Sequence, residues 1–197
     1  MSIDLFTPLN PAIEAAYGAL TAVADALHPL AGSAAAPLAV VAFTMAVRAL
    51  MLPLSRASLR GTGARPWPAL AQAPFFMVLY RVVSAPLIGG HANVLLDNAV
   101  FGMPLGGHLV QVFTGALGLP GLVAFGGLAA ALAAVAWWSS RTTRPGAPVT
   151  RLQRIAPFAT LLSLAVVPFA AGLYVLTSSA WATAERAVVY RRMAAAG

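Results

Sequence analysis

Two arginines interrupt apolar stretches of this sequence, where a charged side chain needs an explanation. Arg48 lies within the apolar run 34–54, and Arg81 lies within the run 70–88. In a helix that rises 1.5 Å per residue, Arg48 is about 9 Å from one end of its run and about 20 Å from the other. A charge at that depth in a bilayer costs from ~3 to more than 10 kcal/mol unless it faces water or a partner. We therefore expect Arg48 to face a hydrated space.

Polar side chains recur at helical spacing near Arg48 and again near the carboxyl end of the chain. Thr44, Arg48 and Ser55 follow one another at i, i+4 and i+11, which places them on one stripe of a helix. A second stripe in the last apolar stretch consists of Tyr174, Thr177, Ser178, Trp181 and Glu185. Two polar stripes in a largely apolar chain predict a shared hydrated cavity between helices.

The same residues also have purely structural interpretations. Arg48 can extend its long side chain to the headgroups, or it can hold two helices together with Glu185 as its candidate ion-pair partner. Arg81 lies about 10 Å from the nearer end of its run, so for this residue we favour such snorkelling to the interface. Serines and threonines commonly bond between helices in lipid, so on their own they indicate little.

The composition indicates that these helices lie in a membrane. Hydrophobic residues make up 60% of the chain and charged residues 9%, whereas soluble proteins carry roughly 25% charged residues. The net charge of +7 comes from arginines, with no lysine. These arginines flank apolar runs and form no patch interleaved with aromatic residues, so we expect no direct nucleic-acid binding.

Several kinds of active site are excluded by residue type. The chain has no cysteine, which excludes disulfides, thiolate metal sites and cysteine nucleophiles. His28, His91 and His108 are scattered outside the predicted spans. Without a lysine, the Gly-Gly pairs lack the context of a phosphate-binding loop. We therefore expect no catalytic residues, no metal and no cofactor, and hence no enzyme.

We predict an all-α membrane protein with five transmembrane helices, at about 34–54, 70–88, 119–138, 153–167 and 170–190. The apolar stretch 155–190 is too long for a single crossing at 1.5 Å per residue. Pro168 and Gly172 interrupt this stretch, so we predict a tight turn at 168–172 between two crossings. The spans then form one core, 34–192, which is followed by a short cytoplasmic tail, 193–197.

An amino-terminal segment, 1–33, precedes this core. Asn10 and Pro11 predict the start of a helix, with Asn10 as its cap, and Pro29 and Gly32 predict its end. Apolar residues repeat along one face, which consists of Ile13, Tyr17, Leu20, Ala24 and Leu27. Polar residues lie on another face, so we predict an amphipathic helix in the membrane interface.

The charges predict an orientation. The segments assigned to the cytoplasm hold three, four and three arginines, which are ten of the twelve, and the outer segments hold none. Cytoplasmic loops carry an excess of basic residues, so we place the amino terminus outside and the carboxyl terminus in the cytoplasm. The first 47 residues contain no Arg or Lys. We therefore interpret this end as a translocated tail and not as a signal peptide.

Four segments resemble the YidC/Oxa/Alb family of membrane-protein insertases. Residues 43–54, Phe-Thr-Met-Ala-Val-Arg-Ala-Leu-Met-Leu-Pro-Leu, resemble its first core span, in which a buried Arg precedes a Pro-Leu pair. Residues 72–76, Gln-Ala-Pro-Phe-Phe, with Leu79 and Tyr80, are similar to its second core span. Residues 167–174 resemble the turn between its last two spans, and residues 178–183 the segment after that turn. The resemblance runs in order along essentially the whole chain.

The resemblance implies a five-helix core around a hydrophilic groove that opens to the cytoplasm and to lipid and is sealed outside. It implies an insertase and chaperone that helps small membrane proteins enter the bacterial plasma membrane, with Arg48 attracting their polar or acidic tails. The further candidates for the substrate-binding groove are Thr44, Gln72, Tyr80, Ser178 and Trp181. The implied partners are newly made membrane proteins, the lipid bilayer and the Sec translocon.

The chain departs from the family pattern at two places. The family carries a long charged hairpin between the first two core spans, where this chain has only the loop 55–69 with two prolines. The tail after Tyr190 is also short, which puts contact with a ribosome in doubt. Two alternatives therefore remain, a non-inserting paralogue that binds and stabilises membrane partners, and a small transporter.

Overall fold

The structure is a computed structural model that describes residues 9–53, 55–56, 67–100, 102–142 and 150–195. Its main helices are α1 (Asn10–Ala31), α2 (Ala35–Leu50), α4 (Trp67–Ser84), α7 (Gly118–Arg141) and α10 (Phe169–Ala195). A broken helical segment before α10 consists of α8 (Arg151–Ile155), the 3-10 helix η3 (Ala156–Phe158) and α9 (Ala159–Ser163). Each predicted span overlaps one of these helical segments.

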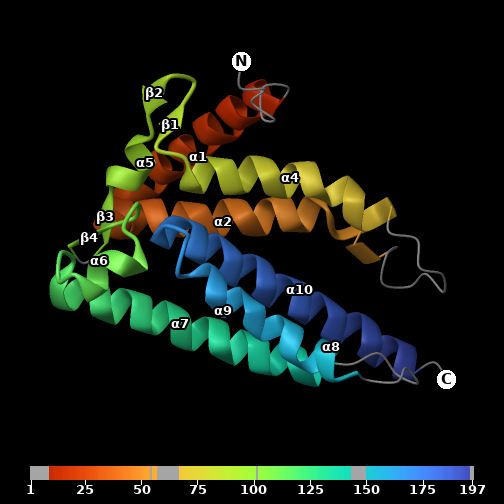
Figure 1. The fold of residues 1–197 in the computed structure, drawn as a ribbon. Helices are drawn as coiled ribbons and strands as arrows, with labels where there is room; N and C mark the ends of the chain where they lie inside the picture. The colour runs from red at the N-terminus through yellow and green to blue at the C-terminus, as the bar shows by residue number, and fades with distance from the viewer. Residues whose placement is uncertain (1–8, 54, 57–66, 101, 143–149, 196–197) are drawn as a thin grey trace, which may run out of the picture.

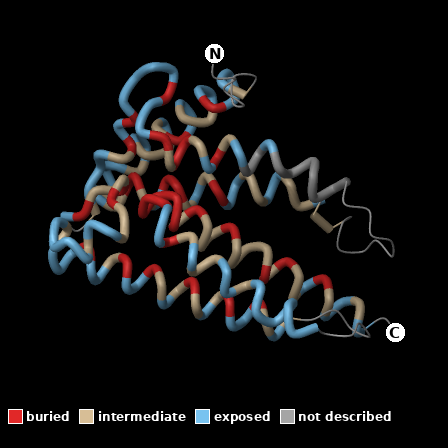
Figure 2. Tube along the Cα trace, viewed as in Figure 1, coloured by how far each residue is buried: buried red, intermediate tan, exposed pale blue. Residues whose placement is uncertain are grey.

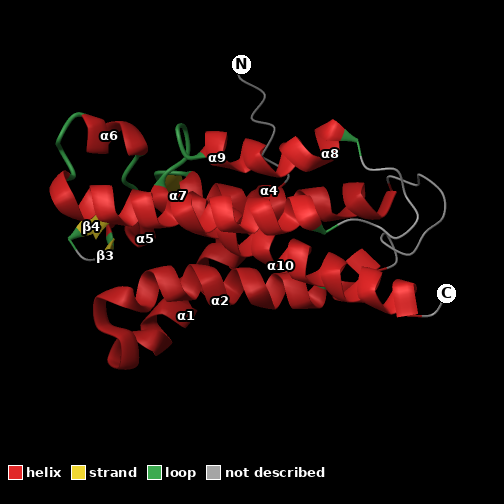
Figure 3. Ribbon diagram, turned by 90° about the horizontal axis from the view of Figure 1, so that it is seen from below, coloured by secondary structure: helices red, strands yellow, loops and turns green. Residues whose placement is uncertain are grey.

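The helices form a bundle in which α10 is central. This helix packs against α2, α4 and α7, while α8, η3 and α9 pack against α7 (Figure 1). Seen along a perpendicular direction, α8 and α9 lie on one side of the bundle and α1 and α2 on the other (Figure 3). The polar stripe predicted on the last helix therefore runs through the middle of the molecule.

Two helical stretches are long and apolar enough to cross a membrane. They are 10–50, in which α1 and α2 are joined through the 3-10 helix η2 (Gly32–Ala34), and α7. Large apolar side chains on the bundle surface are exposed, among them Val123 on α7 and Leu162 on α9, at 66% and 76%. Buried residues gather where the helices face one another and near one end of the bundle (Figure 2). Such an apolar exterior suits lipid as its solvent.

The first helix packs its apolar face on the bundle. Ile13 and Leu20 are buried against α2 and α4, whereas Glu14 and Asp25 are exposed. The predicted Asn10 cap is wrong, because the helix begins with Asn10 itself and has no side-chain cap. Pro29 does not end the helix either, since a proline in the last turn removes one hydrogen bond and the chain turns only at Gly32, where φ is +52°.

The segment 85–117, which we call the cap, contains more regular secondary structure than its glycine content suggests. It contains two hairpins, β1 (Leu87–Ile88) with β2 (His91–Ala92) and β3 (Ala99–Val100) with β4 (Met103–Pro104). Two short helices, α5 (Val94–Asp97) and α6 (Leu109–Phe113), complete it. Leu95, Met103 and Leu105 are at most 1% exposed and give the cap a core.

The cap is bonded to the helices on either side of it. The Asn93 side chain, 3% exposed, donates to the carbonyls of Val82 and Ala85 at 2.7 and 2.9 Å and accepts from Leu95 N at 3.2 Å. These bonds satisfy two carbonyls at the end of α4 and one amide at the start of α5. The amides of Phe169 and Ala170 donate to the carbonyls of Gly107 and Leu105 at 2.8 and 2.9 Å. The start of α10 is therefore docked on the cap.

These contacts explain why the predicted turn at 168–172 is misplaced. The chain turns over 164–168, and α10 begins directly after Pro168 because cap carbonyls accept its first amides. Gly172 lies inside α10 and is buried. A Cβ at this position would lie 2.6 Å from Leu128 Cδ2 on α7. The glycine thus allows a close approach of two helices.

Candidate functional site

A polar cavity of about 480 Å³ lies between α2, α7, the segment α8–α9 and α10. It occupies the end of the bundle opposite the cap, since its walls come from the last turns of α2 and α7 and the second half of α10. The polar residues of its lining are Arg48, Ser139, Ser140, Thr142, Gln153, Thr160, Ser178, Ser179, Thr183, Arg186 and Tyr190. No acidic residue is among the described residues that line it, so the cavity carries positive charge.

Arg48 lines this cavity from the last turn of α2. Its side chain is half-buried and lies within electrostatic range of Tyr174 and Glu185 on α10. Glu185 is 9% exposed and lies within electrostatic range of Arg56 as well as Arg48. The two polar stripes predicted from the sequence therefore do face each other across one boundary between helices.

Several polar atoms beside this boundary are buried without a partner. Ser178 Oγ, Trp181 Nε1 and Glu185 Oε1 have no hydrogen bond of standard geometry to any described residue, although the Ser178 hydroxyl lies close to that of Tyr174. Leaving such a group unsatisfied costs about 1–3 kcal/mol, so buried polar groups usually bond to water or a ligand. The concentration of three such atoms on one helix favours a hydrated space next to α10.

Arg186 is a cavity residue that the sequence analysis missed. Its Nη2 donates to Ser139 Oγ on α7 at 2.9 Å and to Thr183 Oγ1 at 3.2 Å, and its Nε donates to the Ala182 carbonyl at 3.2 Å. The sequence analysis counts this arginine only as one of the cytoplasmic charges at the inner end of the last span, 170–190. The available signal was its spacing, because Ser178, Ala182 and Arg186 follow at intervals of four residues and share a helical face.

The other predicted groove residues lie in different surroundings. Thr44 is 2% exposed and donates to the Val40 carbonyl at 2.6 Å, so it adjoins the cavity wall without lining it. Trp181 is half-buried and is likewise absent from the lining. The side chain of Gln72 lies outside the described residues. Of the predicted set, the cavity brings together Arg48 and Ser178.

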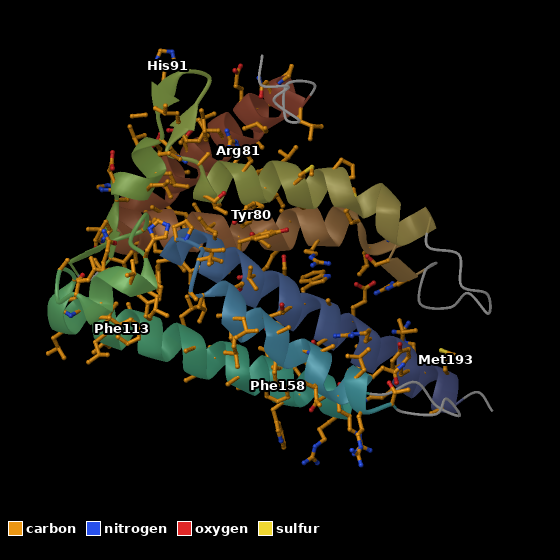
Figure 4. The ribbon with its side chains drawn as sticks, in the orientation of Figure 1. Tyr80, Arg81, His91, Phe113, Phe158 and Met193 are labelled. Carbon is orange, nitrogen blue, oxygen red and sulfur yellow. The ribbon has the colours of Figure 1, made fainter. Side chains whose placement is uncertain are left out.

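Tyr80 does not line the cavity, which corrects our prediction. Its side chain is 41% exposed on α4, and Figure 4 shows it and Arg81 on this helix, away from α7 and α8 (Figure 4). Leu79, Val82 and Val83 are buried instead. Because successive helical positions are rotated by about 100°, burial of Leu79 turns Tyr80 outward. Arg81 is half-buried one turn before α4 ends at Ser84, next to the cap.

The described residues contain no group of three or more His, Asp or Glu side chains that could hold a metal ion. The arrangement can therefore act by charge and hydrogen bonding, through two arginines and the surrounding hydroxyl and amide groups. Comparison of the chain with models of protein families, with curated protein sequences and with solved structures finds no match. The function must therefore be inferred from the geometry of the cavity.

Proposed function

We propose that this chain is a membrane-protein insertase and chaperone of the YidC/Oxa/Alb type. The observation that carries the proposal is the polar, positively charged cavity with Arg48 in its wall, at one end of an otherwise apolar bundle. A hydrophilic tail that crosses pure hydrocarbon leaves its polar groups unsatisfied at several kcal/mol each. A hydrated cavity that reaches partway through the bilayer shortens that crossing.

We place five crossings in the membrane, formed by α2, α4, α7, the segment α8–α9 and α10, with α1 at the outer interface. Arginines on the cavity side support a cytoplasmic position for that end. Arg191 and Arg192 are exposed at the end of α10, and Arg141 lies 4.9 Å from the centre of the Trp137 ring. Aromatic residues beside basic ones are typical of a headgroup boundary.

In this orientation the cap faces outward and the cavity faces the cytoplasm. The cap's bonds to α4 and α10 support a closed outer end, so a substrate tail would enter from the cytoplasm. Its acidic or polar groups would lie near Arg48, while the apolar helix that follows would remain in lipid along the bundle surface. The cavity then acts by solvation and charge, without covalent chemistry or a nucleotide.

Reconstitution tests this proposal directly. Purified protein in liposomes should insert a small membrane protein that has a short acidic tail, measured as protease protection of the translocated tail. Empty liposomes and liposomes with heat-unfolded protein are the controls. Protection no greater than in empty liposomes would rule out insertase activity for this substrate class. Impermeant labelling of cysteines placed at Ser2 and Gly197 should label the first from outside and the second from the cytoplasmic side.

The short loop 55–69 favours a second candidate, a paralogue that binds and stabilises membrane partners without inserting them. This segment has room for no long charged hairpin. The same liposomes separate the two functions, because a stabilising protein would bind the substrate and co-purify with it while the tail stays sensitive to protease. Flux of a small solute without either result would instead indicate a transporter.

A further inference from the structure

The guanidinium of Arg186 is fixed in a way that leaves one end of it available. Nε and Nη2 are occupied by the Ala182 carbonyl and by the hydroxyls of Ser139 and Thr183. Thr183 is 1% exposed and is itself held by a 2.8 Å bond to the Ser179 carbonyl. No hydrogen bond joins Nη1 to a described residue. Two N–H donors of a pre-positioned cation are therefore left for a ligand.

The positive charge of Arg186 is not offset from within the cavity. Its neighbour Glu185 is directed to the side of α10 that faces Arg56 and Arg48, whereas Arg186 bonds to Ser139 on α7. No ion pair of Arg186 occurs in the part of the chain that the structure describes. The cavity thus contains Arg48 and Arg186 as two cations, and its described lining includes no carboxylate.

The two arginines lie on different walls of the cavity, Arg48 on α2 and Arg186 on α10. Arg186 bonds to Ser139 on α7, whereas Arg48 lies within electrostatic range of Tyr174 and Glu185 on α10. A segment that enters the cavity can therefore meet a cation on more than one side.

We infer that Arg186 is a second anion-binding residue, which binds a carboxylate of the substrate's polar segment from another wall of the cavity that contains Arg48. This inference rests on the proposed function, since it assigns a residue to the same path. A peptide segment fits the wall because its amides can bond to the surrounding serine, threonine and glutamine side chains. Affinity comes from a cation that is already ordered and loses little freedom on binding.

Binding of a soluble peptide measures this role separately from insertion. The probe is a fluorescent peptide with aspartates at alternate positions, compared with the same peptide carrying asparagines, and the protein is held in phosphatidylcholine nanodiscs. Wild type should bind the aspartate peptide more tightly than the asparagine peptide. Arg186→Gln should raise the Kd of the aspartate peptide about tenfold, as expected for the loss of one charge-assisted bond, and leave the asparagine peptide unchanged. Arg186→Lys should retain part of the preference.

Arg191→Gln is the matched control, because it removes the same charge from an exposed position on the same helix outside the cavity. It should change the Kd of either peptide less than Arg186→Gln does. Equal binding of the two peptides by wild type would overturn the inference. So would equal weakening of both by Arg186→Gln, or a shared loss of melting temperature in the Gln and Lys variants, which would make Arg186 a structural clamp.

Phosphatidylglycerol distinguishes a lipid site from a peptide site. An effect of Arg186 that appears only with this anionic lipid, and not with the aspartate peptide, would also overturn the inference. Charge-dependent peptide binding without insertion in liposomes would instead support it while removing the insertase function. The two proposals can therefore fail independently.

Discussion

The two ends of the bundle differ in the hydrogen bonding of their buried polar groups. In the cap, the side chain of Asn93 makes three hydrogen bonds at 3% exposure. Near the cavity, Oε1 of Glu185 at 9% exposure makes none to the described residues. Both positions are almost inaccessible to solvent. The two ends therefore differ in whether their buried polar atoms have partners within the protein. The polar groups of the cap are bonded within the protein, whereas polar atoms beside the cavity have no partner among the described residues.

Breaking the cap should have the largest effect on stability. Asn93→Ala removes three bonds and leaves two carbonyls at the end of α4 without their donor, which should cost about 3 kcal/mol of unfolding free energy. We expect Tm in detergent to fall by roughly 10 °C. Asn98→Ala is the control, since the exposed Asn98 donates a single bond, to the Val94 carbonyl. Equal loss in both variants would show that the Asn93 bonds do not hold the cap.

The next effect concerns the contact between α7 and α10 at the cap end. Gly172→Ala places a Cβ 2.6 Å from Leu128 Cδ2 and 3.1 Å from Leu164 Cδ2, so these buried side chains must shift, at a cost of about 1 kcal/mol. At Gly126, in the exposed middle of α7, a Cβ meets nothing within 4 Å. Gly126→Ala should therefore stabilise the helix by up to ~1 kcal/mol. Thermal unfolding of both variants checks the sign of each change.

Substitutions of Arg48 test the cavity through insertion activity and not through stability. Arg48→Ala should lower insertion of acid-tailed substrates about tenfold, with a smaller loss for neutral tails, because one charge-assisted interaction is removed. The fold should remain intact, because Arg56 still lies within electrostatic range of Glu185 in this variant. Arg48→Lys should retain much of the activity, although it lacks the guanidinium fork. A large fall in Tm for the Ala variant would instead identify Arg48 as structural support for Glu185.

The smallest effect should come from Ser178. Ser178→Ala removes a hydroxyl that lies close to that of Tyr174 without a hydrogen bond of standard geometry, so the unfolding free energy should change by no more than ~1 kcal/mol. Its comparison with Asn93→Ala contrasts the two ends at similar burial. A loss near that of Asn93→Ala would mean that Ser178 is bonded within the protein, and the proposed hydration of the cavity would lose its support.

Hydrophobic runs and arginine positions were sufficient to predict the helices but not all their ends. The third span was predicted at 119–138 and α7 runs from Gly118 to Arg141. The second was predicted to reach residue 88, yet α4 stops at Ser84. Pro86 disfavours helix at the residue before it. The side chain of Asn93, nine residues after Ser84, donates to the Val82 carbonyl near the end of the helix. That contact is not visible in a local pattern.

The site residues were predictable where the helical spacing of polar residues agreed with their position inside an apolar run. Arg48 and Ser178 line the cavity, as their stripes indicated. Arg186 was missed because counting arginines for orientation treats each as a loop charge, although its side chain bonds inward to Ser139. The cap was missed because its strands are two residues long, which is too short to show an alternation of apolar and polar residues.

The bonds from Phe169 and Ala170 to the cap also have a consequence for biogenesis. The first amides of a helix need acceptors, because they have no partners within the helix. Here the acceptors are the carbonyls of Gly107 and Leu105, about sixty residues earlier in the chain. During synthesis from the amino terminus, the receiving site is therefore made before the helix that docks on it. The last helix is thus completed when its partner already exists.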